Sequence, residues 1–202
     1  STEDILKVLS EYIDVLMIRN NNHEQLLNFA SLNVLPIING LSNFSHPCQI
    51  LSDIFTFEEL LGKIKNKNIS WIGDCNNVLN SLIEASQIFE FNLNIFTPKI
   101  LFLNLKKKLE IKKLKYFKFF HDVEPIVKNS DCVMTDTWVS MGEKNNKKKK
   151  NLLKKFQVND IIMNKTKDKT IFMHCLPAHR NEEVTDSVID GPKSVVLQQA
   201  KN

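Results

Sequence analysis

The segment Ile69-Ser70-Trp71-Ile72-Gly73-Asp74-Cys75-Asn76-Asn77 carries the clearest signal of the fold class in this chain. A strand-like run, Ile69–Gly73, leads into a polar loop, and residues 78–90 then carry apolar side chains at helical spacing. Strand-like and helix-like segments alternate with short connections on both sides of this unit. This alternation is typical of the α/β class and predicts a parallel sheet with helices on both faces.

The same periodicity sets the expected elements along the whole chain. Strands are expected at residues 14–19, 35–39, 69–73, 93–97, 118–120, 131–136, 170–175 and 194–197. Helices are expected at residues 1–12, 23–32, 46–61, 78–90, 100–116, 124–129, 146–156 and 182–190. Asn39-Gly40 is interpreted as a turn, and all five glycines are expected at turns or loops.

The composition is that of an ordinary soluble globular protein, with 202 residues, 43% hydrophobic and 25% charged. The formal net charge of +4 comes from lysine runs such as 106–108 and 147–150. These runs lack interleaved aromatic residues, which favours a solvated helix face over a nucleic-acid site. No apolar run approaches the length needed to span a membrane. We therefore expect no nucleic-acid partner and no membrane partner.

The four cysteines, at 48, 75, 132 and 175, form no C-x-x-C pair and fit neither a zinc site nor a disulfide framework. This usage suits a reducing compartment, so a cytoplasmic location is expected. A metal site built from His174, Cys175 and His179 is disfavoured, because no further ligand set is apparent. No metal is expected.

Polar clusters stand at three junctions between elements, and they predict a ligand site. They are His46-Pro47-Cys48-Gln49, Asp136-Thr137-Trp138-Val139-Ser140-Met141-Gly142 and the segment from His174 to Arg180. In open α/β sheets, ligands bind beyond the carboxyl ends of the strands. Asp136 suits a ligand ammonium group and Arg19 suits a phosphate or carboxylate. For Cys175, three interpretations stay open: a nucleophile, a weak hydrogen-bond donor or a small buried hydrophobe.

Residues 73–77 occupy the place of a dinucleotide-binding turn but lack the G-x-G-x-x-G pattern, which argues against NAD. Asn76 and Asn77 offer amide groups for an amino-acid head group. The competing interpretation is a plain turn with an asparagine helix cap.

Taken together and in order, these segments resemble the aspartate/ornithine carbamoyltransferase family over nearly the whole chain. The matching segments are Pro36–Ser42 running into His46-Pro47-Cys48-Gln49, Trp71–Asn77, Asp136–Gly142, His174-Cys175-Leu176-Pro177, Glu182-Glu183-Val184 and Gln199-Ala200-Lys201-Asn202. Within the family, the Ser-Met-Gly and His-Cys-Leu-Pro segments point to ornithine rather than aspartate.

The resemblance implies a two-domain carbamoyltransferase architecture with the N-terminal domain incomplete. Residues 1–52 would be a remnant of the carbamoyl-phosphate-binding domain, and residues 53–198 the ornithine-binding Rossmann-like domain. The implied reaction carries the carbamoyl group from carbamoyl phosphate to the δ-amine of L-ornithine, giving citrulline and phosphate, within arginine metabolism. It needs no cofactor, and the full-length protein is expected to be a homotrimer.

The resemblance also assigns roles by position. Arg19, His46, Gln49, Cys175 and Leu176 are expected to bind carbamoyl phosphate. Asn77, Asp136, Ser140 and Met141 are expected to bind ornithine. The residues expected to be catalytic are Cys175, Asp136 and His46.

Two departures from the family pattern bear on activity. The Ser-Thr-Arg-Thr phosphate loop of the family would lie upstream of Ser1, so little or no activity is expected of this chain alone. Cys75 stands where the family usually has glycine, and it is expected to be strained if the backbone there needs a positive φ. The alternative to an enzyme fragment is a non-catalytic amino-acid-binding relative that lacks the phosphate loop.

Overall fold

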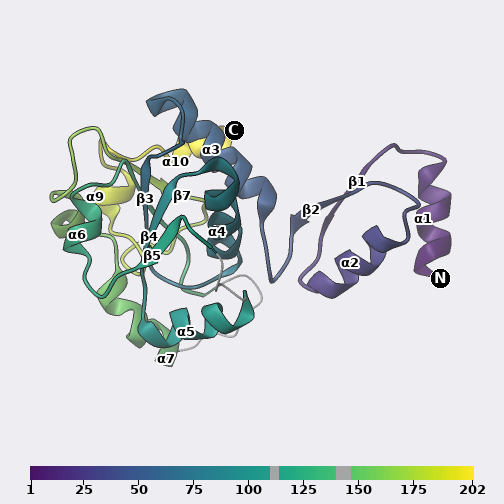
Figure 1. Cartoon of the computed structure of the whole chain (residues 1–202), viewed down its shortest axis with the longest axis horizontal. Coiled ribbons are helices and arrows are strands. Elements are labelled where there is room, and N and C mark those ends of the chain that lie inside the picture. The colour runs from purple at the N-terminus through teal and green to yellow at the C-terminus, as the bar shows by residue number, and fades with distance from the viewer. Residues whose placement is uncertain (110–113, 140–146) are drawn as a thin grey trace.

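The computed structural model describes residues 1–109, 114–139 and 147–202 and confirms the α/β class (Figure 1). The helices are α1 Thr2–Ser10, α2 His23–Ser31, α3 Pro47–Leu61, α4 Asn77–Phe89, α5 Lys99–Lys108, α6 Glu124–Val127, α7 Lys147–Leu153, α8 Asp160–Met163, α9 Asp186–Ile189 and α10 Val196–Lys201, with a 3-10 helix, η2, at Lys154–Phe156. The strands are β1 Leu16–Arg19, β2 Ile37–Leu41, β3 Asn68–Ile72, β4 Asn92–Phe96, β5 Phe117–Phe119, β6 Cys132–Thr135 and β7 Ile171–His174.

The main sheet is entirely parallel, in the order β5-β4-β3-β6-β7. The chain builds outward from β3 through β4 to β5, and then crosses to the other side of β3 for β6 and β7. The direction of winding therefore reverses between β3 and β6. Such a switch point opens a crevice at the carboxyl ends of the strands, where ligands bind in sheets of this kind.

Each face of this sheet packs against its own set of helices, because the side chains of a strand alternate between the two faces. Ile69, Trp71 and Met134 point into a core that includes α3 and α4. Val133 and Phe172 point into the opposite core, which is lined by α6, α8 and α9. The predicted arrangement of helices on both faces is thus confirmed.

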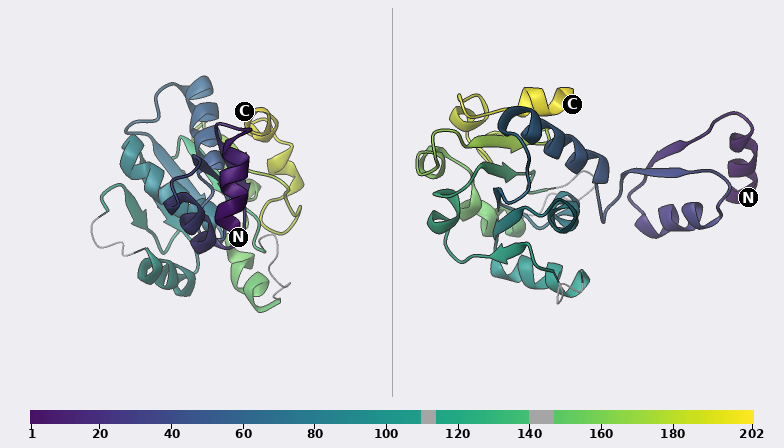
Figure 2. Two further views of the ribbon diagram at one scale, coloured as in Figure 1. Left: turned by 90° about the vertical axis from the view of Figure 1, so that its right-hand side faces the viewer. Right: turned by 45° about the horizontal axis from the view of Figure 1, so that its top comes forward.

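A smaller unit precedes this sheet and contains α1, α2 and the parallel pair β1-β2 (Figure 2). The chain leaves it after β2 and enters α3, which packs on both β2 and α4. Pro47 at the first turn and Gly62 at the end, with a φ of 74°, mark the bounds of α3 as the sequence indicates. The predicted domain boundary at residues 52/53 falls inside this helix and stays a prediction.

Gly40 does not lie in a turn, as the sequence suggested, but inside β2. It is the extra residue of a bulge, since Ile18 pairs with Asn39 and Arg19 with Leu41. A Cβ on Gly40 would lie 3.0 Å from Met17 Cγ and 3.3 Å from the Ile18 carbonyl oxygen. Glycine is needed here because the neighbouring strand approaches closely.

Other segments also differ from the sequence prediction. Residues 194–197 do not form a strand: only Ser194 makes an isolated bridge, to Phe172, and the chain then turns into α10. The helix predicted at 182–190 is limited to α9, and the one predicted at 100–116 ends at Lys108, with Leu109 as its C-cap. The short helix α8, capped by Asn159, was not predicted.

Within the described part of the chain, no helix has both the length and the apolar character required to cross a bilayer.

Candidate functional site

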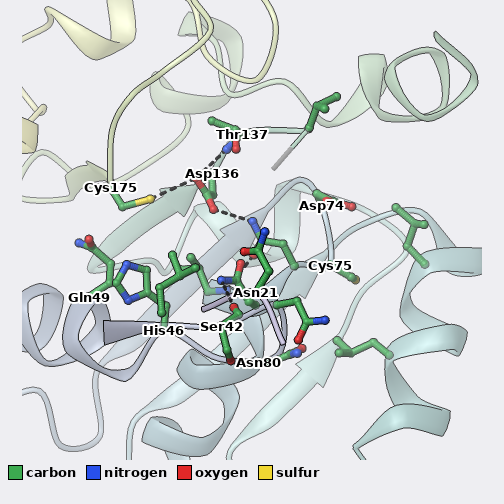
Figure 3. A pocket seen from close by; sticks show the side chains of 18 of the residues that line it. Asn21, Ser42, His46, Gln49, Asp74, Cys75, Asn80, Asp136, Thr137 and Cys175 are labelled. Carbon is green, nitrogen blue, oxygen red and sulfur yellow. Dashed lines mark hydrogen bonds between the residues drawn. The ribbon is translucent and has the colours of Figure 1, made fainter. Parts of the chain in front are cut away.

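A pocket of about 1060 Å³ lies at the switch point of the sheet, between the main sheet and the smaller N-terminal unit (Figure 3). Residues that follow β3, β6 and β7 form one wall, and residues that follow β1 and β2 form another. Seven of the predicted site residues line this single pocket: Arg19, His46, Gln49, Asn77, Asp136, Cys175 and Leu176. Ser140 and Met141 lie outside the described residues.

Asp136, directly after β6, is the polar centre of the wall that the main sheet contributes (Figure 3). Its Oδ2 accepts from Asn76 Nδ2 at 2.5 Å, and its Oδ1 accepts from the Thr137 backbone N–H at 2.7 Å. The Cys175 thiol donates to the same Oδ1, with the Sγ atom at 3.1 Å. One buried carboxylate thus ties together the loops after β3, β6 and β7.

Cys175 is a protonated thiol in this environment. Burial, followed by the adjacent Asp136 carboxylate, holds the pKa of the Cys175 thiol well above its ordinary value. A thiolate, the form required of a nucleophilic cysteine, is therefore disfavoured here. Of the three interpretations left open by the sequence, the geometry supports the weak hydrogen-bond donor.

His46 caps the start of α3 and turns its ring into the pocket opposite Asp136 (Figure 3). Its backbone N–H donates to Ser81 Oγ at 2.8 Å, which fixes the entry of α3 against α4. Burial is the main cause that lowers the pKa of the His46 imidazole, and the Arg19 guanidinium lowers it further, against an opposing effect of Asp136. His46 is therefore a neutral ring at pH 7, able to donate one N–H without carrying a charge.

Gln49 lies one turn after His46 on α3, and its side-chain Nε2 donates to Asp53 Oδ1 at 2.8 Å. Leu176, at the end of β7, donates its backbone N–H to His174 Nδ1 at 2.9 Å. Asn77 Nδ2 donates to the Ser42 carbonyl oxygen at 2.8 Å and so joins the start of α4 to the loop after β2. Each of these residues is held by a partner that does not depend on a ligand.

An ion pair between Asp74 and Lys149 also lines the pocket, with 2.7 Å between Oδ2 and Nζ, and no sequence pattern predicts it. The side chains are only 2% and 18% exposed. The expectation that the lysine run 147–150 is a solvated face holds for Lys147 and Lys148. Lys150 is partly buried and paired with Glu182, and the expectation is wrong for Lys149. No residue pattern within the run distinguishes this lysine, because its burial depends on the end of β3.

Cys75 also lines the pocket, beside Asp74. Its φ is not positive, so the strain expected of a residue that replaces glycine is absent. The Cys75 Sγ lies 3.5 Å from Thr97 Oγ1, and burial raises the pKa of the Cys75 thiol to about 12.

A metal would have to compete with existing hydrogen bonds at this site. The ligand atoms of Asp136, His174 and Cys175 lie within 4.8 Å of one another. However, His174 Nδ1 already accepts from the Leu176 backbone, and its Nε2 lies 3.2 Å from Glu183 Oε1. Both ring nitrogens of His174 are thus engaged within the protein.

The fold and the pocket define a class: a two-part α/β protein whose ligand site lies at the switch point of a parallel sheet and is closed by a preceding unit. Two family models match the chain. The model described as "Aspartate/ornithine carbamoyltransferase, carbamoyl-P binding domain" matches residues 1–59, and the "Asp/Orn binding domain" of the same description matches residues 65–202. The chain belongs to the aspartate/ornithine carbamoyltransferase family.

Individual relatives agree with this placement. The ornithine carbamoyltransferase of Rhodopseudomonas palustris is 51% identical over 200 residues, which cover 98% of this chain and 64% of the relative. That of Brucella abortus is 46% identical over 209 residues, with the same coverage. The chain thus spans about 64% of the length of these relatives.

Solved structures show the same architecture. Ornithine carbamoyltransferase from Burkholderia thailandensis matches with a TM-score of 0.87 and 39% identity, covering 100% of this chain and 65% of that one. The enzyme of the same name from Pyrococcus furiosus matches with a TM-score of 0.85 and 38% identity, covering 100% of this chain and 66% of that one.

Proposed function

We infer that the protein acts in ornithine carbamoyl transfer. The δ-amine of L-ornithine attacks the carbamoyl carbon of carbamoyl phosphate, the C–O bond to phosphate breaks, one amine proton is released, and citrulline and phosphate result. The observation that carries this proposal is the convergence of seven separately predicted residues on one pocket. Relatives named ornithine carbamoyltransferase, one of them 51% identical, indicate the reaction.

On the carbamoyl phosphate side, the proposed ligands are Arg19, His46, Gln49, Cys175 and Leu176. Arg19 provides a permanent positive charge for phosphate oxygens. The neutral His46 suits donation to the carbamoyl oxygen, where negative charge develops as the amine attacks. A donor aligned with such an oxygen contributes on the order of 3 kcal/mol to the transition state.

On the ornithine side, the proposed ligands are Asn77 and Asp136, together with Ser140 and Met141. The Asp136 carboxylate suits the α-ammonium group, and an amide such as that of Asn77 suits the α-carboxylate. The Cys175 thiol, which already donates to Asp136, would lie near the reacting amine. Both substrates held in line would supply the large entropic part of the rate enhancement.

The family resemblance further supports a role in arginine metabolism and a homotrimeric assembly of the whole protein, and the cysteine usage supports a cytoplasmic location.

Calorimetry on the purified chain tests the ornithine side directly. We expect L-ornithine and L-norvaline to bind, because both carry the α-amino acid head group, and putrescine, which lacks it, not to bind. Asp136→Asn should weaken ornithine binding by about tenfold or more, since a buried charged hydrogen bond is lost. Asp160→Asn, on α8, serves as the control away from the pocket.

A citrulline assay with both substrates then separates the two interpretations of the family resemblance. Citrulline formed by this chain, even at low turnover, would exclude the non-catalytic amino-acid-binding alternative. A chain that binds neither ornithine nor norvaline would contradict the proposed function.

A further inference from the structure

Asp53 is a buried carboxylate one helical turn beyond Gln49 on α3, and the proposed reaction does not use it. Its side chain is only 3% exposed, and it does not line the large pocket. Its Oδ1 accepts two amide donors: Gln49 Nε2 at 2.8 Å and Gln199 Nε2, from α10, at 2.7 Å. An apolar side chain at such a position often leaves a protein equally stable or more stable, so packing alone does not account for the carboxylate.

The carboxylate has a directional effect on Gln49. An ionised aspartate can only accept hydrogen bonds, so the Gln49 amide must turn its NH₂ group toward Asp53. Its carbonyl oxygen, Oε1, then points away from Asp53. Within the described residues, no group donates to that oxygen, and Gln49 lines the pocket. The Gln49 Oε1 atom is therefore a hydrogen-bond acceptor that is left for a ligand in the pocket.

Asp53 fixes the orientation of the Gln199 side-chain amide in the same way. Because its NH₂ group is committed to Asp53, its Oε1 accepts the His174 backbone N–H at 2.9 Å. His174 directly precedes Cys175 and Leu176 at the end of β7. Asp53 thus connects α3 to the opposite wall of the pocket through two amides whose polarity it fixes.

We propose that Asp53 is a positioning residue that orients Gln49 so that its carbonyl oxygen faces the ligand, which makes the pocket selective for a group bearing an N–H donor. The ligand class is a carbamoyl or primary amide group. A methyl ketone or acyl group of the same shape would leave the Gln49 oxygen without a donor. This rests on the proposed function, because it assigns the donor to the carbamoyl NH₂.

A pair of isosteric ligands, carbamoyl phosphate and acetyl phosphate, tests the selectivity, since they differ only by NH₂ in place of CH₃. We expect the wild-type chain to bind carbamoyl phosphate about tenfold more tightly, the scale of one hydrogen bond to an otherwise unpaired acceptor. Asp53→Leu should reduce this preference to about twofold or less, because Gln49 is then free to rotate.

Two matched variants distinguish orientation from mere packing. Asp53→Asn keeps an acceptor oxygen and should keep most of the preference. The new amide should turn this oxygen toward Gln49 and Gln199, because the opposite orientation would place its NH₂ against their two NH₂ groups. Gln199→Leu breaks the link to α10 but leaves the bond from Gln49 to Asp53 intact, so it should also keep the preference. Equal losses in Asp53→Leu and Gln199→Leu would mean that Asp53 only holds α10 in place, and would overturn the proposal.

A second measurement needs no ligand. The side-chain NH₂ signals of Gln49, assigned by their loss in Gln49→Met, should shift with pH as Asp53 titrates, and those of Gln199 should shift in parallel. The other titratable groups near Asp53 are Asp136, His174, Cys132 and Cys175, so the shift must vanish in Asp53→Asn. A Gln49 signal that does not respond to Asp53 would overturn the proposal. This result does not depend on ligand binding, so it can be told apart from a failure of the proposed function, in which wild type would bind neither phosphate compound.

Discussion

The thiol of Cys175 and the carboxylate of Asp136 share a hydrogen bond that controls the reactivity of the cysteine. Burial, and after it the negative charge of Asp136, raises the pKa of the Cys175 thiol, so Asp136→Asn should lower that pKa and increase the thiolate fraction at pH 8. We expect faster alkylation of Cys175 by iodoacetamide, by about tenfold for each pKa unit removed. Mass spectrometry of the modified peptides measures this rate.

Cys75 in the same sample is the internal control. The pKa of its thiol is raised chiefly by burial, and Asp136 is not among the causes. The ratio of Cys175 to Cys75 modification should therefore rise in Asp136→Asn. An unchanged ratio would contradict the assigned hydrogen bond.

Asp53 should make stability depend on pH. Burial raises the pKa of the Asp53 carboxyl from 3.8 to about 6, so the folded chain holds this proton more tightly than the unfolded chain does. Stability from this group is therefore present at low pH and is lost as pH rises through about 6. Compared with Asp53→Asn, wild type should lose about 2 kcal/mol of unfolding free energy between pH 4 and pH 7.

Urea unfolding of both chains across this pH range measures the difference. Repeating the series in 0.5 M salt should leave it nearly unchanged, because a buried group is weakly screened. A difference between the two chains that does not vary with pH would show that Asp53 is not perturbed as described.

Many of the residues that line the pocket could be predicted from the sequence, whereas the residues that hold them in place could not. Seven pocket residues lie near strand ends or helix starts, where a local sequence motif indicates a ligand site. They are Arg19, His46, Gln49, Asn77, Asp136, Cys175 and Leu176. Asp53, Lys149 and Gln199 act through partners far along the chain, as Gln199 does with Asp53 across 146 residues. Such long-range pairing leaves no local pattern.

Asn76 is the N-cap of helix α4 and also donates a hydrogen bond to Asp136. The Asn76 side-chain oxygen accepts from Val78 N and Leu79 N, and its Nδ2 donates to Asp136. Asn76→Asp keeps an equally good cap but places a second carboxylate against Asp136. We expect a loss of about 1–3 kcal/mol at pH 7.5, from the repulsion and the lost hydrogen bond, measured by urea unfolding.

Asn159→Asp is the matched control for this prediction. Asn159 caps α8 by accepting from Ile162 N and has no acidic partner like Asp136 in the described residues. Its replacement should change stability by about 0.5 kcal/mol or less. If both variants lose the same amount, the loss at Asn76 comes from the cap and not from Asp136.

The elements of the main sheet could be predicted because β3, β4, β6 and β7 are short apolar runs followed by polar loops. The failures occurred where tertiary contacts overrode local signals. A strand is expected at residues 194–197, but Val196 opens α10 and packs into the core that contains α9. Asn39-Gly40 signals a turn, but the close approach of β1 recruits Gly40 into a bulge.

The two units that enclose the pocket differ in the size of their hydrophobic cores. Residues 1–45 contribute three buried hydrophobic side chains, Leu6, Leu26 and Leu35, to their own unit. Large apolar side chains such as Ile5, Tyr12 and Met17 are 61%, 79% and 61% exposed. The sheet of this unit has only two strands, which is marginal for independent stability.

We therefore expect the unit that contains β1 and β2 to open without unfolding the main sheet. Hydrogen exchange followed by mass spectrometry should show amides of β1 and β2 exchanging at least tenfold faster than those of β3 and β6. Leu26→Ala should speed exchange in β1 and β2 only, whereas Ile83→Ala, in the core beneath β3, should speed exchange throughout the main sheet. Equal protection of β1 and β3 in wild type would contradict this division.

The pocket links this opening to ligand binding. Arg19 ends β1, and Asp136 follows β6, so ligands bound at both residues would bridge the two units. A ligand that binds only the closed arrangement stabilises it in proportion to its saturation. If the proposed function is correct, carbamoyl phosphate with norvaline should slow exchange in β1 and β2 more than norvaline alone, and should leave β3 unchanged. Protection confined to the main sheet would show that the N-terminal unit does not take part in binding.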